Sequence, residues 1–531
     1  MKRIITTAFL LLVFAAPAAE AQRRAEYTNP VAAGDYPDPS VIRVGRDYWA
    51  TTTTSEWGPH FTLMHSRDLV NWRQVGVVFR RPPRWAVGSF WASEIAEDRG
   101  RFYIYYSARQ PNGGPLCVAV ATAPRPQGPY TDRGPLVCQK VGSIDGFHVR
   151  DENGRRYLLW KEDGNSVSAP TPIWAQPLSP DGTRLVGQPQ ELIRNTESWE
   201  KHPTLPYGDL VEGPSIVRRG GWFYMFYSGN FCCGRECNYM VGVARSRRLL
   251  GPWEKAPANP IMAGNDDWKC PGHGTVVETA DGRHYYLYHA MDAKDFVYVG
   301  RQMMLDEIAW GADGWPTINR GRGPSRRAAS PHGVRETDAE YRFAEEFTSA
   351  ALAPGWQWPV GHEPLHSLRP GAGGWLTLAP PQGRADSPLG AVLARPITTG
   401  DYVATTLVNA AAQRGGAAGL SAFGDLENAL GVSVGGGRVM VWRREKNEQR
   451  ELAGAAAPRG SRLQLRMTAR EGRFYRFAFS ADGRAWTDVG EEVDGTYLPP
   501  WDRGVRVALV AGGAQGASAS FDWLRVVPAR R

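Results

Sequence analysis

After its first 21 residues, the chain of 531 residues has no apolar run long enough to span a bilayer. It also lacks long segments with the hydrophobic period of an amphipathic helix, which predicts an all-β protein. The formal net charge is +8, but the arginines are spread through turns and connecting segments and form no stripe. The charge therefore indicates a solvated surface with some attraction for acidic polysaccharide, and it gives little support for nucleic-acid binding.

The N-terminus has the composition of an export signal. Lys2 and Arg3 precede an apolar run over residues 4–16, and the small residues Ala19 and Ala21 follow it. This order predicts a signal peptide over residues 1–21 and a secreted or periplasmic mature protein without a membrane span. A membrane anchor is the alternative, but the run is short for a bilayer.

Cysteine is scarce, and in an exported chain the six cysteines favour disulfides. Cys117 and Cys138 lie on successive segments, where a local bridge is expected. The second group consists of Cys232, Cys233, Cys237 and Cys270. Its pairing is open, and a zinc site is the alternative, although the spacing fits no common zinc motif.

A hairpin pattern recurs along the N-terminal part of the chain. In residues 211–228, a short apolar strand, a turn at Arg219-Gly-Gly221 and an alternating aromatic strand follow the polar residue Glu212. Four further copies begin in the same way with an ionisable side chain. The five leading residues, separated by 51 to 67 positions, are Asp38, Glu94, Asp145, Glu212 and His273.

Strand-rich repeats of this length predict a five-bladed β-propeller. If each leading residue begins the innermost strand of its blade, four carboxylates and a histidine converge at one mouth of the central channel. Crowded carboxylates push their pKa values apart, which is a property of catalytic sites. Prolines on both sides of Asp38 restrict its backbone, as suits a base that must be held in position.

Six ordered motifs resemble those of glycoside hydrolase family 43. They are Pro37-Asp-Pro-Ser40, Phe90-Trp-Ala-Ser-Glu94, Ile144-Asp145, Val211-Glu-Gly-Pro-Ser215, Pro271-Gly-His-Gly274 and Gly300-Arg301. The resemblance covers residues 25–318. It implies a five-bladed propeller enzyme that acts on arabinose- or xylose-containing glycans.

The resemblance also implies roles for the acids. Asp38 is expected to be the general base, Asp145 to orient and tune the acid, and Glu212 to be the general acid. Such hydrolysis needs a protonated carboxyl on one side of the glycosidic bond and an ionised one on the other. The family inverts configuration, which predicts that Asp38 and Glu212 lie roughly 6.5 to 9.5 Å apart with a water between them.

Other positions of the motifs imply contacts with substrate or metal. Arg301 is expected to contact the sugar, although Gln302 departs from the family pattern there. His273 is expected at the channel centre, bound to calcium or to a water network, and no organic cofactor is expected. Phe90 and Trp91 are candidates for stacking on a sugar ring, with packing between blades as the alternative. Glu94 is expected to be peripheral to catalysis.

Several functions stay open within this interpretation. The motifs do not separate an α-L-arabinofuranosidase from a β-xylosidase, and an endo-arabinanase or a non-catalytic glycan-binding propeller are the alternatives. Fructan-processing enzymes share the propeller, but their Asn-Asp-Pro and Arg-Asp-Pro motifs are missing from this sequence.

The C-terminal part is expected to be a second β domain. Residues 319–342 are charged and turn-rich, as in a linker, and residues 343–531 contain short alternating strands typical of a β-sandwich. The sandwich resembles the concanavalin-like domain appended to exo-acting family members. Either it binds glycan itself or it forms one wall of the active-site pocket, and the short linker favours the second.

Overall fold

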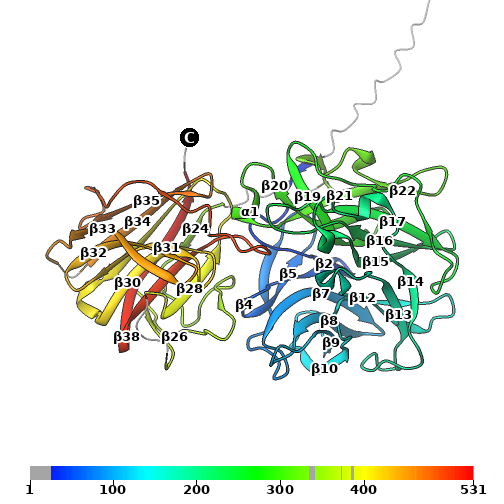
Figure 1. Cartoon of the computed structure of the whole chain (residues 1–531), viewed down its shortest axis with the longest axis horizontal. Coiled ribbons are helices and arrows are strands. Elements are labelled where there is room, and N and C mark those ends of the chain that lie inside the picture. The colour runs from blue at the N-terminus through cyan, green and yellow to red at the C-terminus, as the bar shows by residue number, and fades with distance from the viewer. Residues whose placement is uncertain (1–24, 334–340, 372, 384–387, 461, 530–531) are drawn as a thin grey trace, which may run out of the picture.

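The structure, a computed structural model, describes the chain except residues 1–24, 334–340, 372, 384–387, 461 and 530–531. The predicted signal peptide therefore lies outside the described residues. What is described is almost entirely β-structure, which confirms the predicted fold class (Figure 1). Among the described residues, the helical elements are α1 (Phe296–Val299) and five 3₁₀ turns: η1 (Gly164–Val167), η2 (Ser198–Glu200), η3 (Pro206–Gly208), η4 (Asn319–Gly321) and η5 (Ala410–Ala412). Within the described ranges, none of these helices has the length and hydropathy of a membrane span.

The N-terminal domain consists of five antiparallel, four-stranded sheets, numbered here as blades 1 to 5 in chain order. Blade 1 contains β2 (Ser40–Val44), β3 (Asp47–Thr52), β5 (His60–Ser66) and β6 (Arg73–Phe79), and blade 2 contains β7 (Gly88–Asp98), β8 (Arg101–Arg109), β9 (Leu116–Ala123) and β10 (Thr131–Val137). Blade 3 contains β11 (Ser143–Arg150), β12 (Arg156–Glu162), β13 (Ile173–Pro177) and β14 (Gln190–Ile193). Blade 4 contains β15 (Val211–Arg219), β16 (Trp222–Gly229), β17 (Met240–Ser246) and β18 (Glu254–Lys255), and blade 5 contains β19 (Trp268–Glu278), β20 (His284–Asp292), β21 (Gln302–Trp310) and β22 (Pro316–Ile318).

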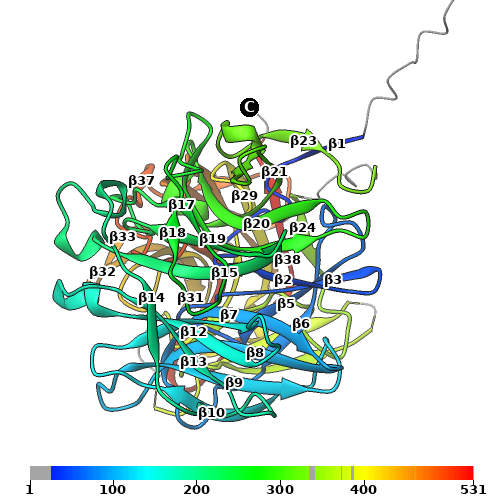
Figure 2. The same cartoon turned by 90° about the vertical axis from the view of Figure 1, so that its right-hand side faces the viewer.

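The first strands of the blades form a closed ring. Strands β2, β7, β11, β15 and β19 each contact the next one, and β19 contacts β2. In Figure 2 several of these strands lie around the middle of the propeller. The domain is closed by β1 (Glu26–Thr28), which pairs with β23 (Arg327–Ala329). Residues 327–329, expected in the linker, therefore belong to this closing pair because β1 offers them a partner strand.

The C-terminal domain is a β-sandwich, as predicted. Its strands are β24 (Phe343–Glu345), β25 (Trp358–Pro359), β26 (Leu365–Arg369), β27 (Trp375–Ala379), β28 (Ala391–Pro396), β29 (Tyr402–Asn409), β30 (Arg414–Phe423), β31 (Ala429–Gly435), β32 (Arg438–Glu445), β33 (Glu448–Ala456), β34 (Arg462–Arg470), β35 (Phe474–Ser480), β36 (Thr487–Asp488), β37 (Val493–Asp494) and β38 (Arg506–Pro528). The long strand β38 belongs to both layers. Its first part pairs with β28 and β30, and its last part pairs with β24, β27 and β29. Apolar side chains from both layers form the core between them.

The two domains share apolar packing. Strand β4 (Trp57–Gly58) of the propeller pairs with β25 of the sandwich. Trp57 packs into a cluster of sandwich residues, and residues of α1 join the sandwich core. The side chains of Asp35 and Arg506 form an ion pair of 3.0 Å across the interface, and each is only 2% exposed. An interface with this much buried apolar and ionic contact fixes the sandwich against the propeller.

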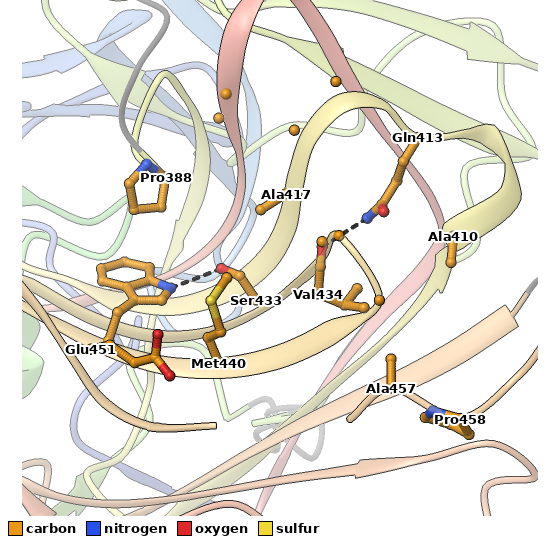
Figure 3. A pocket seen from close by; sticks show the side chains of 18 of the residues that line it. Pro388, Ala410, Gln413, Ala417, Ser433, Val434, Met440, Glu451, Ala457 and Pro458 are labelled. Carbon is orange, nitrogen blue, oxygen red and sulfur yellow. Dashed lines mark hydrogen bonds between the residues drawn. The ribbon is translucent and has the colours of Figure 1, made fainter. Parts of the chain in front are cut away.

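The sandwich carries a hollow of about 1100 Å³ on the side of β30, β31 and β32 (Figure 3). Its wall is rich in glycine. At its edges, Trp442 Nε1 donates a hydrogen bond to Ser433 Oγ and Gln413 Nε2 donates one to the carbonyl of Val434. Every residue that lines the hollow belongs to the sandwich. It is the candidate surface for the alternative in which this domain binds glycan.

All six cysteines are paired, which overturns the zinc alternative because no thiolate is left to bind a metal. Cys117 and Cys138 form the expected local bridge. In the second group, Cys237 pairs with Cys270 and the adjacent residues Cys232 and Cys233 pair with each other.

Candidate active site

The first strands of the blades share one local irregularity. In blades 2 to 5, the pairing of the first and second strands is interrupted by a bulge, at residues 91–94, 144–147, 212–215 and 272–275. Each bulge contains a residue with positive φ, and Asp38 has φ 52° at the matching place before β2. The matching residues are Asp38, Ala92, Asp145, Gly213 and His273. Bulges redirect side chains out of a strand. Here they bring residues from several blades to one mouth of the channel.

The strand register shows that two of the five leading residues, Glu94 and Glu212, do not occupy the position in their blades that Asp38, Asp145 and His273 occupy in theirs. Glu212 lies one position before the left-handed residue of its blade, and Glu94 lies two positions after it. Glu94 therefore points into the channel beneath the site, where its carboxylate lies 3.5 Å from Thr275 Oγ1. Burial raises the pKa of Glu94 to about 8. Its exclusion from the catalytic set agrees with this position.

A pocket of about 510 Å³ opens at the channel mouth. Six of the predicted site residues line it: Asp38, Trp91, Asp145, Glu212, His273 and Arg301. Phe90 does not line it. Its side chain is fully buried and packs against the rings of His60 and Phe61. The prediction that Phe90 contacts a sugar is therefore corrected, because successive residues of a strand face opposite sides and only Trp91 faces the pocket.

Asp38 is surrounded by cationic and imidazole groups. Its Oδ1 lies 3.0 Å from Arg301 Nη1, 3.2 Å from His289 Nδ1 and 3.6 Å from His273 Nδ1. Burial acts to raise the pKa of Asp38, but Arg301 and the two histidines outweigh it and hold the pKa well below its ordinary value. Asp38 therefore stays ionised throughout the physiological range.

Asp145 has the opposite electrostatic state. Its Oδ2 accepts a hydrogen bond of 2.9 Å from the backbone N–H of Gly213, the residue next to Glu212. Burial, and then the nearby charge of Glu212, raise the pKa of Asp145 to about 7 against a lowering effect of His273. Asp145 therefore retains its proton up to near-neutral pH.

Glu212 is held on both oxygens. Its Oε2 accepts a hydrogen bond of 2.8 Å from Lys161 Nζ, and its Oε1 accepts one of 2.8 Å from the hydroxyl of Tyr239. Lys161 is almost completely buried and also donates to Asp163 and Asn165. Burial acts to lower the pKa of Lys161, but Asp163 and Glu212 outweigh it and raise the pKa, so the lysine stays charged. These contacts fix the direction in which the Glu212 carboxyl points.

Sequence reasoning missed Lys161, Tyr239 and His289. Lys161 and His289 lie on second strands of their blades, opposite the bulged first strands. A lysine within the apolar run Tyr157-Leu-Leu-Trp-Lys161 was the available signal, since a buried lysine requires a partner. Tyr239 follows the cysteine-rich loop and carried no such signal.

The sandwich contributes part of the wall. Trp501 and Asp502 line the pocket, and the backbone carbonyl of Asp502 accepts a hydrogen bond of 2.9 Å from Arg301 Nη2. The indole rings of Trp91 and Trp501 meet edge to face with centroids 5.9 Å apart. Arg301 thus connects Asp38 of the propeller with the sandwich.

The residues around His273 do not form a metal cage. In the part of the chain that the structure describes, no three His, Cys, Asp or Glu side chains are grouped as metal ligands. The His273 ring lies beside the Asp38 carboxylate and close enough to Asp145 to lower its pKa, and the His273 backbone N–H donates to Ser228 Oγ. Calcium prefers six to eight oxygen ligands. The side chains present do not fit such an ion, so no step proposed below involves one.

Comparisons with known proteins agree with this geometry. Residues 27–316 match the family described as glycosyl hydrolases family 43, and residues 344–527 match the β-xylosidase C-terminal concanavalin A-like domain. The chain is 29% identical over 371 residues to a "Xylosidase/arabinosidase 43B" of Humicola insolens, covering 66% of this chain and 65% of that one. It is 28% identical to an "Extracellular exo-alpha-(1->5)-L-arabinofuranosidase ArbA" of Cellvibrio japonicus, covering 54% of this chain and 86% of that one.

Among solved structures, the GH43 protein BlXynB from Bacillus licheniformis superimposes with a TM-score of 0.80 at 26% identity, covering 95% of this chain and 100% of that one. Against the curated Humicola relative, the match spans 65% of the relative's length, which is less than two thirds.

Proposed function

Since the chain belongs to glycosyl hydrolases family 43, we propose that it is an inverting glycosidase that removes terminal α-L-arabinofuranosyl or β-D-xylosyl residues from plant cell-wall glycans. The observation that carries the proposal is the convergence of three carboxyl groups in two electrostatic states. Asp38 is held ionised, and the pKa of Asp145, which binds the backbone next to Glu212, is raised to about 7. Hydrolysis of a glycosidic bond needs one carboxyl group in each of these states.

Asp38 acts as the general base. Its carboxylate stays ionised beside Arg301 and His289, and it accepts a proton from a water molecule that attacks the anomeric carbon. The same contacts prevent Asp38 from rotating. No covalent bond to the enzyme forms in this mechanism, because the water attacks directly.

Glu212 acts as the general acid and protonates the leaving oxygen. Lys161 and Tyr239 hold its carboxyl group in position, and burial raises the pKa of the neighbouring Asp145 to about 7, so a carboxyl proton is present at the site. Asp145 also binds the backbone next to Glu212, so it orients the strand segment from which the acid projects.

The proposed sugar class rests on the names of the relatives, and the proposed exo-action rests on the shape of the pocket. The relatives named above are a xylosidase/arabinosidase and an exo-arabinofuranosidase. The sandwich residues Trp501 and Asp502 close one side of the pocket. A pocket closed on one side accepts a chain end better than the middle of a chain, which favours exo-action over the endo-arabinanase alternative. An "Extracellular" relative and the predicted signal peptide support export to the periplasm or the medium.

The test is hydrolysis of two aryl glycosides, an α-L-arabinofuranoside and a β-D-xyloside, by the purified protein. We expect turnover of at least one of them, and its loss in Asp38→Asn. Binding of either sugar without turnover would favour the non-catalytic alternative. Dialysis against EDTA tests the calcium expectation separately. Because the side chains around His273 do not fit the ion, we expect the melting temperature and the activity to stay unchanged, and a fall in either would show that an ion is bound.

A further inference from the structure

The pocket wall contains a disulfide between adjacent residues. Cys232 and Cys233 are bonded to each other, and both line the pocket that contains the three acids. Such a bond closes a small ring with the peptide unit between the two residues. Cys233 is buried and Cys232 is half-buried, so part of this ring faces the open space.

The disulfide lies on the same blade as Glu212. The loop that carries it follows β16, and β16 pairs with β15 so that Glu212 is opposite Ser228 and Val211 is opposite Gly229. At the start of the loop, the backbone N–H of Asn230 donates to the carbonyl of Leu210. The disulfide is therefore on the wall from which the proposed acid projects. A general acid stands beside the leaving oxygen, so this wall faces the departing part of the substrate.

Several bonds fix the loop in place. Cys237 is bonded to Cys270 of β19, and Arg235 Nη2 donates to the carbonyl of Thr496 in the sandwich. The backbone N–H of Asn238 donates to the carbonyl of Phe231 at 2.9 Å. These bonds hold the loop without help from the Cys232–Cys233 bond. The loop is therefore already fixed, and the Cys232–Cys233 disulfide is not needed to hold it. The disulfide is thus available to contact a ligand in the pocket.

That surface is apolar and polarizable. Phe231 lines the pocket beside the disulfide, and its ring meets the ring of Tyr207 edge to face at 5.3 Å. Asn165 and Ser166 line the same pocket and supply polar groups. A pentose ring presents C–H groups on its face and hydroxyl groups at its edge. Sulfur and aromatic carbon suit the face, and amide and hydroxyl groups suit the edge.

We propose that the Cys232–Cys233 disulfide, together with Phe231 and Tyr207, binds the sugar on the leaving side of the scissile bond. The ligand class is a neutral pentosyl residue of the glycan chain. The inference rests on the proposed function, because the leaving side is defined by the role of Glu212.

The experiment compares substrates with and without a leaving sugar. Xylobiose or arabinobiose places a pentose against the disulfide, whereas β-D-xylosyl or α-L-arabinofuranosyl fluoride places none there. In C232A/C233A, we expect kcat/KM for the disaccharide to fall about tenfold, since apolar contact of one sugar face is lost. For the fluoride, kcat/KM stays unchanged. The matched control is C117A/C138A, which removes a disulfide outside the pocket and leaves the ratio of the two kcat/KM values as it was.

An equal fall for both substrates would mean that the disulfide only supports the fold, and no fall for the disaccharide would mean that it touches no sugar. Either result overturns the proposal. Failure of the unmodified enzyme on both fluorides would instead refute the proposed function, so the two failures are distinct.

A second measurement avoids the double variant in case it does not fold. In E212Q, which retains the disulfide, the rate at which a phosphine reductant opens Cys232–Cys233 is followed by alkylation and mass spectrometry. We expect a saturating disaccharide to slow this reaction severalfold and the monosaccharide to leave it unchanged. Equal rates with both sugars would contradict the placement of the leaving sugar.

Discussion

At the scale of single residues, the site depends on how neighbours divide charge among three carboxyl groups. Arg301 and two histidines keep Asp38 ionised, although burial acts to raise its pKa. Asp145 accepts its hydrogen bond from the backbone of Gly213, and burial and Glu212 raise its pKa to about 7 despite the lowering effect of His273. Environments that separate the pKa values of similar groups assign them to acid and base roles.

The roles of Glu212 and Asp38 predict different responses to the leaving group. Glu212→Gln removes the proton donor, so kcat/KM for a disaccharide falls about 10² to 10⁴-fold. For a dinitrophenyl glycoside, whose leaving group needs no proton, it falls far less. Asp38→Asn removes the base and lowers both rates to the same extent. Steady-state kinetics on the two substrates measure this contrast, and equal losses in Glu212→Gln would remove Glu212 from the acid role.

The pKa of about 7 at Asp145 predicts the alkaline limit of activity. Below this pH Asp145 holds its proton, and above it that proton is lost from the side of the site that must protonate the leaving oxygen, so kcat/KM falls by up to tenfold per pH unit. Asp38 has a lowered pKa, so no matching loss is expected on moving from pH 7 to pH 5. Because the charge of Lys161 lowers the pKa of Asp145, Lys161→Met shifts the alkaline limit upward. A flat profile to pH 9 would contradict this assignment.

At the scale of elements, the bulged first strands determine which residues meet. The repeat of hairpins was visible in the sequence, since each copy has its own turn and aromatic strand. The bulges were not, because they are defined by the pairing of two strands. For this reason the sequence pattern aligns Glu94 with the acids, although it lies two positions beyond Ala92, the left-handed residue of its bulge. Lys161 and His289 were missed for the same reason, since their partners become neighbours through strand register.

Gly213 offers a test of the bulge in blade 4. Its φ is 61°, and a Cβ there would lie 3.0 to 3.2 Å from the ring of His273. Gly213→Ala therefore strains the backbone and displaces His273 and the hydrogen bond to Asp145, and we expect kcat/KM to fall at least tenfold. Gly220 has φ 57° with no atom within 4 Å of a Cβ. Gly220→Ala thus carries the same backbone cost of roughly 1–2 kcal/mol without the collision. Similar activity of the two variants would show that the bulge does not position the site.

At the scale of the whole molecule, the sandwich forms part of the active site. Asp35 of the propeller pairs with Arg506 of the sandwich and accepts a hydrogen bond from the backbone N–H of Arg301. Arg301 in turn binds Asp38 and the carbonyl of Asp502. The sequence predicted the sandwich and favoured the interpretation in which this domain forms one wall of the active-site pocket. It gave no means of choosing Trp501 and Asp502, which lie more than 460 residues from Asp38 and reach it only through docking of the domains.

The buried ion pair predicts a large effect of Asp35→Asn. The change leaves Arg506 charged and without its carboxylate partner, which costs about 3–5 kcal/mol of unfolding free energy. Asp35→Asn also weakens the hydrogen bond from the backbone N–H of Arg301. Arg301 is then held less firmly beside Asp38, so kcat/KM falls. The control is Lys294→Ala, which removes an ion pair with Asp401 across the same interface. Lys294 is 44% exposed, and such pairs contribute about 0–1 kcal/mol. Calorimetry and kinetics of both variants test this, and equal small effects would mean that the buried pair does not couple the domains.

The central claim is that Asp38 activates a water on one side of the sugar while Glu212 protonates the leaving oxygen on the other. The most direct test follows the first product of aryl glycoside hydrolysis by proton NMR before the anomers equilibrate. The account predicts that the sugar released first has the configuration opposite to that of the substrate. A first product that keeps the substrate configuration would contradict it, because retention requires a carboxylate that attacks the sugar itself.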